Sequence, residues 1–199
     1  MAQIHTFHIV YNGCDNKIWR DIQISSTNTL ATLGYCILAS FETLAYHLFY
    51  IEYNGTKYDT YLDDFGDAQA YLSEVKLNQL SIKVGDKFEM LYDFGCEQIF
   101  NISVIGVEEM PRGTGTAYPK VIAGKGRGII DDMPCDELLQ IIKRTDKAGK
   151  SDFVITNEFG HEMVWDYRNY SLKCDDGLIR IRVKEIKDAY ENHLDEYDY

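Results

Sequence analysis

Alternating apolar and polar residues, interrupted by short turn sequences, constrain the fold of this chain more than any other feature. Residues 4–11 and 18–24 alternate on either side of Asn12-Gly13, and a second pair of runs flanks Asn54-Gly55. A period of two places successive side chains on opposite faces of a strand, and an Asn-Gly pair favours the positive φ angles of a tight turn. The N-terminal part of the chain therefore predicts two β-hairpins.

Strand patterns continue beyond these hairpins. Residues 87–94 and 98–105 alternate around Gly95, which predicts a third hairpin. Residues 153–167 have strand character, and residues 179–183 alternate apolar and basic side chains as a strand would. The sheet is therefore expected to continue into the middle of the chain, and further strand-like segments follow near the C-terminus.

Helices are expected between these strands. Apolar residues recur at helical spacing in four segments, at residues 29–41, 67–80, 135–142 and 186–197. The first follows several side-chain oxygens that could cap it. The third follows Asp131, Asp132 and Pro134, and acidic residues and proline favour a first helical turn.

Together these elements predict an α+β fold, in which helices cover a β-grasp-like mixed sheet. The β-grasp comparison depends on the order strand, strand, helix, strand at the start of the chain. We expect one domain over residues 1–146. A C-terminal extension over residues 147–199, with a β-like segment and an amphipathic helix, is expected to pack on the same domain.

The charge balance disfavours nucleic acid as a partner. The 20 Lys and Arg residues face 32 Asp and Glu, a formal net charge of −12, whereas nucleic-acid affinity depends on cations that displace counterions from phosphates. Solubility, or an acidic face for a basic partner, explains this charge. A local basic strip would reverse the expectation, and its members would be Lys120, Lys125, Arg127, Lys143 and Arg144.

The N-terminus and the cysteines indicate a soluble, cytoplasmic protein. No signal peptide begins at Met1, and no window approaches 18 apolar residues, so no membrane partner is expected. The five cysteines are odd in number and form no Cys-x-x-Cys pair: Cys14, Cys36, Cys96, Cys135 and Cys174. We expect reduced, mostly structural thiols and no cofactor.

Several short motifs resemble one known family. They are Lys17-Ile18-Trp19-Arg20, His47-Leu48, Tyr92-Asp93-Phe94-Gly95, Tyr118-Pro119 and Gly124-x-Gly126. In this combination they are similar to the plasmid pRiA4b ORF-3-like family, also met as passenger proteins of IS1096-type mobile elements. The resemblance covers residues 3–145. It implies the fold of that family and no particular reaction.

The chain departs from the family's pattern after the Tyr-Asp-Phe-Gly turn. The family continues with Asp and then with Trp and His at alternate positions, where this chain has Cys96, Gln98 and Phe100. The later loop also lacks the Cys and the Pro-Pro-Glu-Asp run of the family. A family site that needed these side chains is therefore expected to be altered here.

Two segments form the candidate ligand- or partner-binding site. One is the turn of Tyr92, Asp93 and Gly95. The other belongs to the longest expected irregular stretch, at residues 108–128, and contributes Tyr118, Gly124, Lys125, Gly126 and Arg127. Asp93 and this loop could line a pocket, and glycine amides beside two cations could hold a small anion. A rigid β-turn and a flexible loop are the structural alternatives.

Spacing predicts neither a catalytic nor a metal site. The five histidines include no His-x-x-x-His pair, and residues 63–67 lack the spacing of an EF-hand loop. No known nucleophile motif is present. A reactive Cys96 in the glycine-containing turn is a less favoured alternative.

Tyrosine is in excess, with 15 residues, and five of them surround one hairpin: Tyr46, Tyr50, Tyr53, Tyr58 and Tyr61. They suit half-buried strand positions or a protein-binding face. The Tyr-Asp-Phe-Gly turn, the glycine-rich loop and exposed tyrosines together predict a non-enzymatic protein-binding or adaptor module that contacts a protein partner. One alternative is an enzyme or a small-anion or metabolite binder with a pocket at the candidate site. A weaker alternative is a nucleic-acid role linked to mobile elements.

Overall fold

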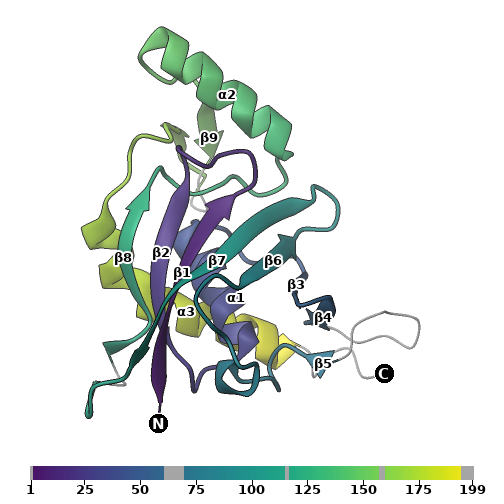
Figure 1. The fold of residues 1–199 in the computed structure, drawn as a ribbon. Coiled ribbons are helices and arrows are strands. Elements are labelled where there is room, and N and C mark those ends of the chain that lie inside the picture. Colours follow the sequence, from purple (N-terminus) through teal and green to yellow (C-terminus); the bar gives the residue numbers. More distant parts are fainter. Residues whose placement is uncertain (1, 61–69, 115–116, 157–159, 194–199) are drawn as a thin grey trace.

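Figure 1 shows the fold in a computed structural model, which describes residues 2–60, 70–114, 117–156 and 160–193. The helices are α1 (Leu30–Ser40), α2 (Cys135–Ala148) and α3 (Leu172–His193), with one 3-10 turn at Leu77–Gln79. The strands are β1 (Gln3–Tyr11), β2 (Trp19–Ser25), β3 (Phe49–Tyr53), β4 (Thr56–Asp59), β5 (Ala70–Tyr71), β6 (Lys87–Tyr92), β7 (Gln98–Glu109), β8 (Lys120–Lys125), β9 (Val154–Thr156) and β10 (Glu162–Val164).

Eight of these strands form one sheet, in the order β5-β4-β3-β6-β7-β1-β2-β8. Neighbours are antiparallel except β4 and β5, which run parallel, so the sheet is mixed. Helices α1 and α3 cover the rear face in Figure 1, and α2 lies across one end of the sheet. The predicted α+β class, with a mixed sheet and covering helices, is confirmed.

The three predicted hairpins are present as β1–β2, β3–β4 and β6–β7. In the second, Asn54 and Gly55 have φ angles of 52° and 74°. A two-residue turn with both central residues at positive φ matches the twist of the flanking strands. The Asn-Gly signal in the sequence therefore identified this turn correctly.

Helix α1 forms the centre of the core. Its N-cap is Thr29, whose hydroxyl accepts a hydrogen bond from the Thr32 amide at 3.2 Å. Nearly all of its residues are buried, because the sheet lies on one side and α3 on the other. On the sheet, Phe7, Ile9 and Tyr11 of β1 are fully buried. The helix predicted at residues 29–41 is confirmed.

Helix α3 replaces the strand that was expected at residues 179–183. Ile179 and Val183 are buried, whereas Ile181, which alternates with them, is 57% exposed. A spacing of four residues places two side chains on the same face of a helix, so Ile179 and Val183 belong to a helical stripe. The predicted terminal helix is present and begins at Leu172.

A buried ion pair connects α3 to the sheet. Arg20 of β2 is fully buried, and its Nε donates to Asp175 Oδ2 at 2.8 Å and to the Ser40 carbonyl at 3.1 Å. Its Nη1 donates to the carbonyl oxygens of Trp19 and Lys125. Burial raises the pKa of the Asp175 carboxyl, and the charge of Arg20 opposes that rise. One guanidinium therefore links β2, α1, β8 and α3.

Two further predictions were wrong. Residues 70–80 form β5 and the 3-10 turn in place of a helix, and residues 67–69 lie outside the described part of the chain. The stretch 108–128 contains β8, which pairs with β2. Gly124 in β8 faces the Tyr170 hydroxyl and the Arg20 side chain, and a Cβ there would lie 2.4 Å from that hydroxyl. The glycine is therefore explained by close packing in a strand.

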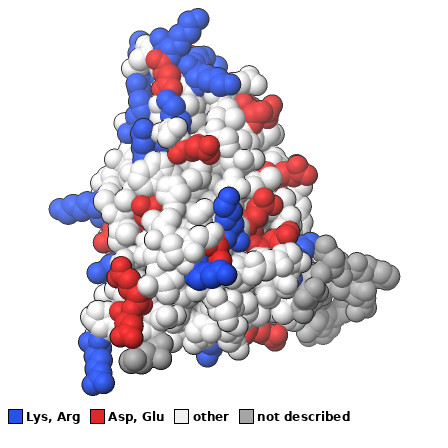
Figure 2. Space-filling view, viewed as in Figure 1, with Lys and Arg blue, Asp and Glu red and all other residues white. Residues whose placement is uncertain are grey.

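Helix α2 begins where the sequence indicates, directly after Pro134, and carries Asp136 and Glu137 in its first turn. It continues to Ala148 and ends at Gly149, whose φ is 71°. Figure 2 shows Lys and Arg side chains gathered around α2, above a sheet face that is mostly uncharged. The net negative charge of the chain is therefore not concentrated on this face.

Candidate metal centre

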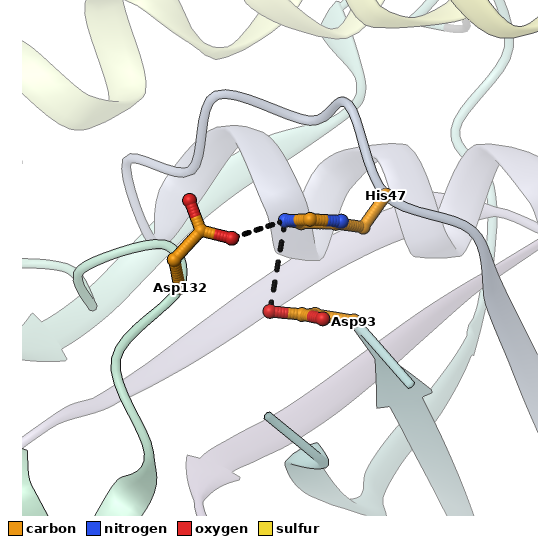
Figure 3. A group of neighbouring side chains, drawn as sticks. All are labelled: His47, Asp93 and Asp132. Atoms are coloured by element: carbon orange, nitrogen blue, oxygen red, sulfur yellow. Dashed lines mark hydrogen bonds and ion pairs between the residues drawn. The ribbon is translucent and has the colours of Figure 1, made fainter. Parts of the chain in front are cut away.

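Three side chains from separate loops meet beside the end of β6 (Figure 3). His47 lies between α1 and β3, Asp93 directly follows β6, and Asp132 precedes α2. The Nε2 atom of His47 lies 2.9 Å from Asp132 Oδ1 and 3.6 Å from Asp93 Oδ2. These three atoms lie within 4.8 Å of one another. The fold therefore brings one imidazole nitrogen and two carboxylate oxygens together.

Asp93 holds its turn with one carboxylate oxygen, and its other oxygen makes no hydrogen bond within the described part of the chain. Its φ is 58°, and its Oδ1 accepts hydrogen bonds from the amides of Gly95 and Cys96 at 3.1 and 3.3 Å. Its Oδ2 has no hydrogen-bond partner among the described residues, although Asp93 is only 4% exposed. A buried, unpaired carboxylate oxygen is costly, because it has lost water without gaining a donor.

Tyr46 fixes Asp132 from the opposite side. Its hydroxyl donates a hydrogen bond to Asp132 Oδ2, while Oδ1 faces His47. The hydrogen bond from Tyr46, with a smaller contribution from His47, lowers the pKa of the Asp132 carboxyl. The same hydrogen bond raises the pKa of Tyr46. Asp132 is therefore held as a carboxylate.

A second set of hydrogen bonds holds these loops together. Asp131 accepts from the Tyr92 hydroxyl at 2.7 Å and from the Leu44 amide at 2.8 Å. Burial raises the pKa of Asp131, and both hydrogen bonds oppose that rise. The Tyr190 hydroxyl of α3 donates to the carbonyl oxygen of His47. The position of the imidazole is therefore set by packed elements on both sides.

The three donors have the chemistry and spacing of a divalent metal site. Zinc takes imidazole nitrogen and carboxylate oxygen at about 2.0–2.2 Å, so tetrahedral ligand atoms lie roughly 3.4 Å apart. The separations of 2.9 and 3.6 Å from His47 Nε2 lie on either side of that value. Three protein ligands would leave at least one position of the ion for water or another ligand.

A cavity of about 730 Å³ adjoins this cluster, and Tyr46, Asp131 and Asp132 line it. Its other walls come from the loop after α1, the segment after β8, the β9–β10 hairpin and α3. Arg127 also lines the cavity, where its Nε lies 2.9 Å from Glu42 Oε2. The cluster therefore stands at the border of a space large enough for a small molecule.

Among the candidate residues from the sequence, the turn lies at this site. Asp93 supplies a donor, Tyr92 binds Asp131, and the Gly95 amide binds Asp93. Of the glycine-rich segment, Arg127 reaches the adjoining cavity.

The other members of that segment lie in different surroundings. Gly124 packs against Tyr170, and the carbonyl oxygen of Lys125 accepts a hydrogen bond from Arg20 Nη1. Gly126 has a φ of 75°, and a Cβ there would lie 2.1 Å from the Lys17 carbonyl oxygen. The ring of Tyr118 lies beneath Lys120 Nζ, at 5.4 Å. An anion site on the glycine-rich loop stays a prediction.

Sequence spacing missed His47 and Asp132. They are 85 residues apart, and Asp93 lies between them. His47 was part of a family motif and one of five histidines without the spacing of metal ligands, and Asp132 was assigned to the start of a helix. Of the positions that depart from the family's pattern, Gln98 and Phe100 are fully buried. Burial, followed by the charge of Asp93, raises the pKa of the Cys96 thiol, which disfavours a reactive thiolate.

The tyrosines do not form one uniform face. Tyr46 is 55% exposed, whereas Tyr53 is 5% exposed and stacks on Phe88. Tyr50 and Tyr58 are half-buried, and Tyr61 lies outside the described residues, as do residues 63–67. Of the five residues that a basic strip would need, Arg127 pairs with Glu42 and Arg144 with Asp152.

Within the described residues, no helix has both the length and the hydrophobicity that a membrane crossing requires. All five cysteines are free thiols.

Comparison with known proteins identifies a solved structure with a similar fold and a family to which the sequence matches. None of the curated proteins matches the chain. The crystal structure of MM3350, a protein of unknown function from Methanosarcina mazei Go1, superposes with a TM-score of 0.67. The two sequences are 21% identical, and the match covers 88% of this chain and 97% of that one, so the likeness concerns the fold. The family model of the plasmid pRiA4b ORF-3-like protein matches residues 3–172. The chain therefore belongs to the plasmid pRiA4b ORF-3-like family.

Proposed function

We propose that this chain binds a divalent transition-metal ion between His47, Asp93 and Asp132. The observation that carries the proposal is the Oδ2 atom of Asp93, which is buried, has no hydrogen-bond partner among the described residues and faces the other two donors. A cation at this point would satisfy that oxygen and offset the charges of both carboxylates.

A protonated imidazole explains the cluster less well. The Nε2 atom of His47 carries one hydrogen at most, and at 2.9 Å Asp132 Oδ1 is the acceptor in reach. The 3.6 Å separation from Asp93 Oδ2 is too long for a hydrogen bond. An imidazolium would therefore leave Asp93 Oδ2 with an ion-pair contact at 3.6 Å and no hydrogen bond, whereas a metal ion could bind all three donor atoms directly.

The ligand set favours zinc, manganese or iron(II) over calcium or magnesium. Imidazole nitrogen is a ligand of transition metals, whereas carboxylate oxygen binds transition metals and also calcium and magnesium. One nitrogen ligand with two oxygen ligands therefore favours a divalent transition-metal ion. Metal binding of this kind is compatible with a non-enzymatic module. The open coordination position of the ion is also compatible with an enzyme. A protein partner and an enzymatic reaction both stay predictions.

Titration calorimetry with Zn²⁺ tests the proposal. We expect one ion to bind per chain, and His47→Gln and Asp132→Asn each to weaken binding at least about tenfold, since even residues that only support metal ligands cost 10–100-fold. Binding should weaken as the pH falls, because protons compete for the ligands. Asp132 has a side chain that is 63% exposed, so its variant is expected to fold normally.

His8→Gln is the matched control. His8 Nδ1 lies 2.6 Å from Asp21 Oδ1 on the sheet, so this pair reproduces a histidine–aspartate contact without the third donor. The control should bind Zn²⁺ as the unmodified chain does. Equal loss in His8→Gln and His47→Gln, or full affinity in Asp132→Asn, would refute the site.

A further inference from the structure

We infer that the cavity beside the metal centre binds a small molecule with an oxyanion head group on an apolar body, and that the head group lies between the metal ion and Arg182. This inference rests on the proposed metal site. It names the class of ligand that would occupy the open metal position.

The walls of the cavity suit an apolar body. The large apolar residues that line it include Ile129, Ile155, Met163, Trp165 and Ile186. They come from the segment after β8, from both strands of the β9–β10 hairpin and its continuation, and from α3. Pockets for small molecules combine such walls with a few polar groups that orient the ligand.

Arg182 is the polar group best placed to hold an anion. It lines the cavity and is half-buried, and its Nη1 makes one long contact of 3.4 Å with the Ala39 carbonyl oxygen. Among the described residues it forms no ion pair within 4.0 Å, although its charge is felt at Asp175. Arg127, the other cation of the cavity, is already paired with Glu42. A guanidinium offers several donors in a planar fork that fits carboxylate and phosphate.

The acidic side chains make this binding depend on the metal ion. Asp131, Asp132 and the exposed Glu185 line the cavity, and a carboxylate oxygen of Asp93 lies within 4.8 Å of one of Asp132. These charges would repel an oxyanion from the metal-free chain. A divalent ion offsets the charges of Asp93 and Asp132 and supplies an open coordination position. The metal ion should therefore bind before the oxyanion.

Octanoate and octyl phosphate serve as probes, because they share one apolar body and differ in head group. Octanol and octylammonium are the neutral and cationic controls. Binding of each is measured by calorimetry to the zinc-loaded and the metal-free chain, and to Arg182→Gln and Arg182→Lys loaded with zinc. The difference between the two anions shows whether carboxylate or phosphate is the preferred head group.

We expect at least one of the anions to bind about tenfold more tightly with zinc present, and to lose about tenfold in Arg182→Gln, with part of the loss restored in Arg182→Lys. Octanol should bind equally with and without zinc. Circular dichroism confirms that both variants are folded. Equal anion binding with and without zinc, preference for octylammonium, or no loss in Arg182→Gln would overturn this inference while leaving zinc binding intact. Failure of the zinc titration itself would remove the metal site and this inference together.

Discussion

Asp93 uses its two carboxylate oxygens for different purposes, and two substitutions separate them. Asn at this position keeps an oxygen acceptor for the Gly95 and Cys96 amides and tolerates the φ of 58°, whereas Ala removes the acceptor. In metal-free buffer we expect the free energy of unfolding of Asp93→Asn to lie within about 1 kcal/mol of that of the unmodified chain. That of Asp93→Ala should be lower by about 1.5–3 kcal/mol. Urea unfolding measures both values.

Zinc titrations complete the comparison, because both variants lack the carboxylate and both should lose zinc affinity. A variant Asp93→Asn that bound zinc normally would show that Asp93 serves the turn alone.

For individual residues, the sequence predicts the turn at Asp93 but not the proposed metal site. Asp93 could be predicted because a strand end followed by glycine is a local signal. His47 and Asp132 could not, because their proximity depends on where the loops after α1 and before α2 meet. Such contacts are set by the packing of distant elements, and no spacing rule for metal ligands encodes them.

Among the elements, α3 depends most on one contact, the pair of Arg20 with Asp175. Arg20→Met should cost about 3–5 kcal/mol at neutral pH, because it leaves the buried Asp175 charge without its paired cation and with only the Tyr170 hydroxyl still donating to it. Burial raises the pKa of Asp175 in the folded chain. A carboxyl with a raised folded pKa stabilises the fold below its unfolded pKa, and that stabilisation is lost as the pH rises through the folded pKa.

The loss of unfolding free energy in Arg20→Met should therefore be smaller at pH 5 than at pH 8. Denaturant unfolding at both pH values measures this loss. Arg20→Met combined with Asp175→Leu is the control, and we expect it to recover much of the loss at pH 8. A deficit that does not change with pH would mean that lost packing, not the stranded charge, causes it.

The elements that sequence patterns predicted correctly are those with local signals. Thr29 caps α1, and Asn54-Gly55 makes its turn. The misassigned segments lack such signals. Ile179, Ile181 and Val183 satisfy a period of two, and only burial shows that Ile181 faces solvent. Gly124 resembled a loop residue because its neighbours in space, Tyr170 and Arg20, are distant in sequence. A division of the chain at residue 146 stays a prediction.

For the whole molecule, the proposed metal site joins loops from three distant parts of the chain, so unfolding must separate its ligands. An ion that binds only the folded state stabilises it by about 2.7 kcal/mol at 100 times the dissociation constant. For a chain of this size, each kcal/mol raises the melting temperature by about 2–4 °C. We expect zinc at that concentration to raise it by about 5–11 °C. Differential scanning calorimetry measures the shift.

The same zinc concentration should leave the melting temperature of Asp132→Asn nearly unchanged. A shift of equal size in both proteins would place the bound zinc elsewhere on the chain.

The hydrogen bond from Tyr190 to the His47 carbonyl spans 143 residues of sequence. Ribosomes add about 5–20 residues per second, so His47 is made roughly 7–29 s before the tyrosine that holds its loop. Asp93 and Asp132 are also made before Tyr190. During synthesis, all three proposed ligands therefore exist before the helix that completes their support, and a nascent chain would meet metal ions with its ligands not yet held in place.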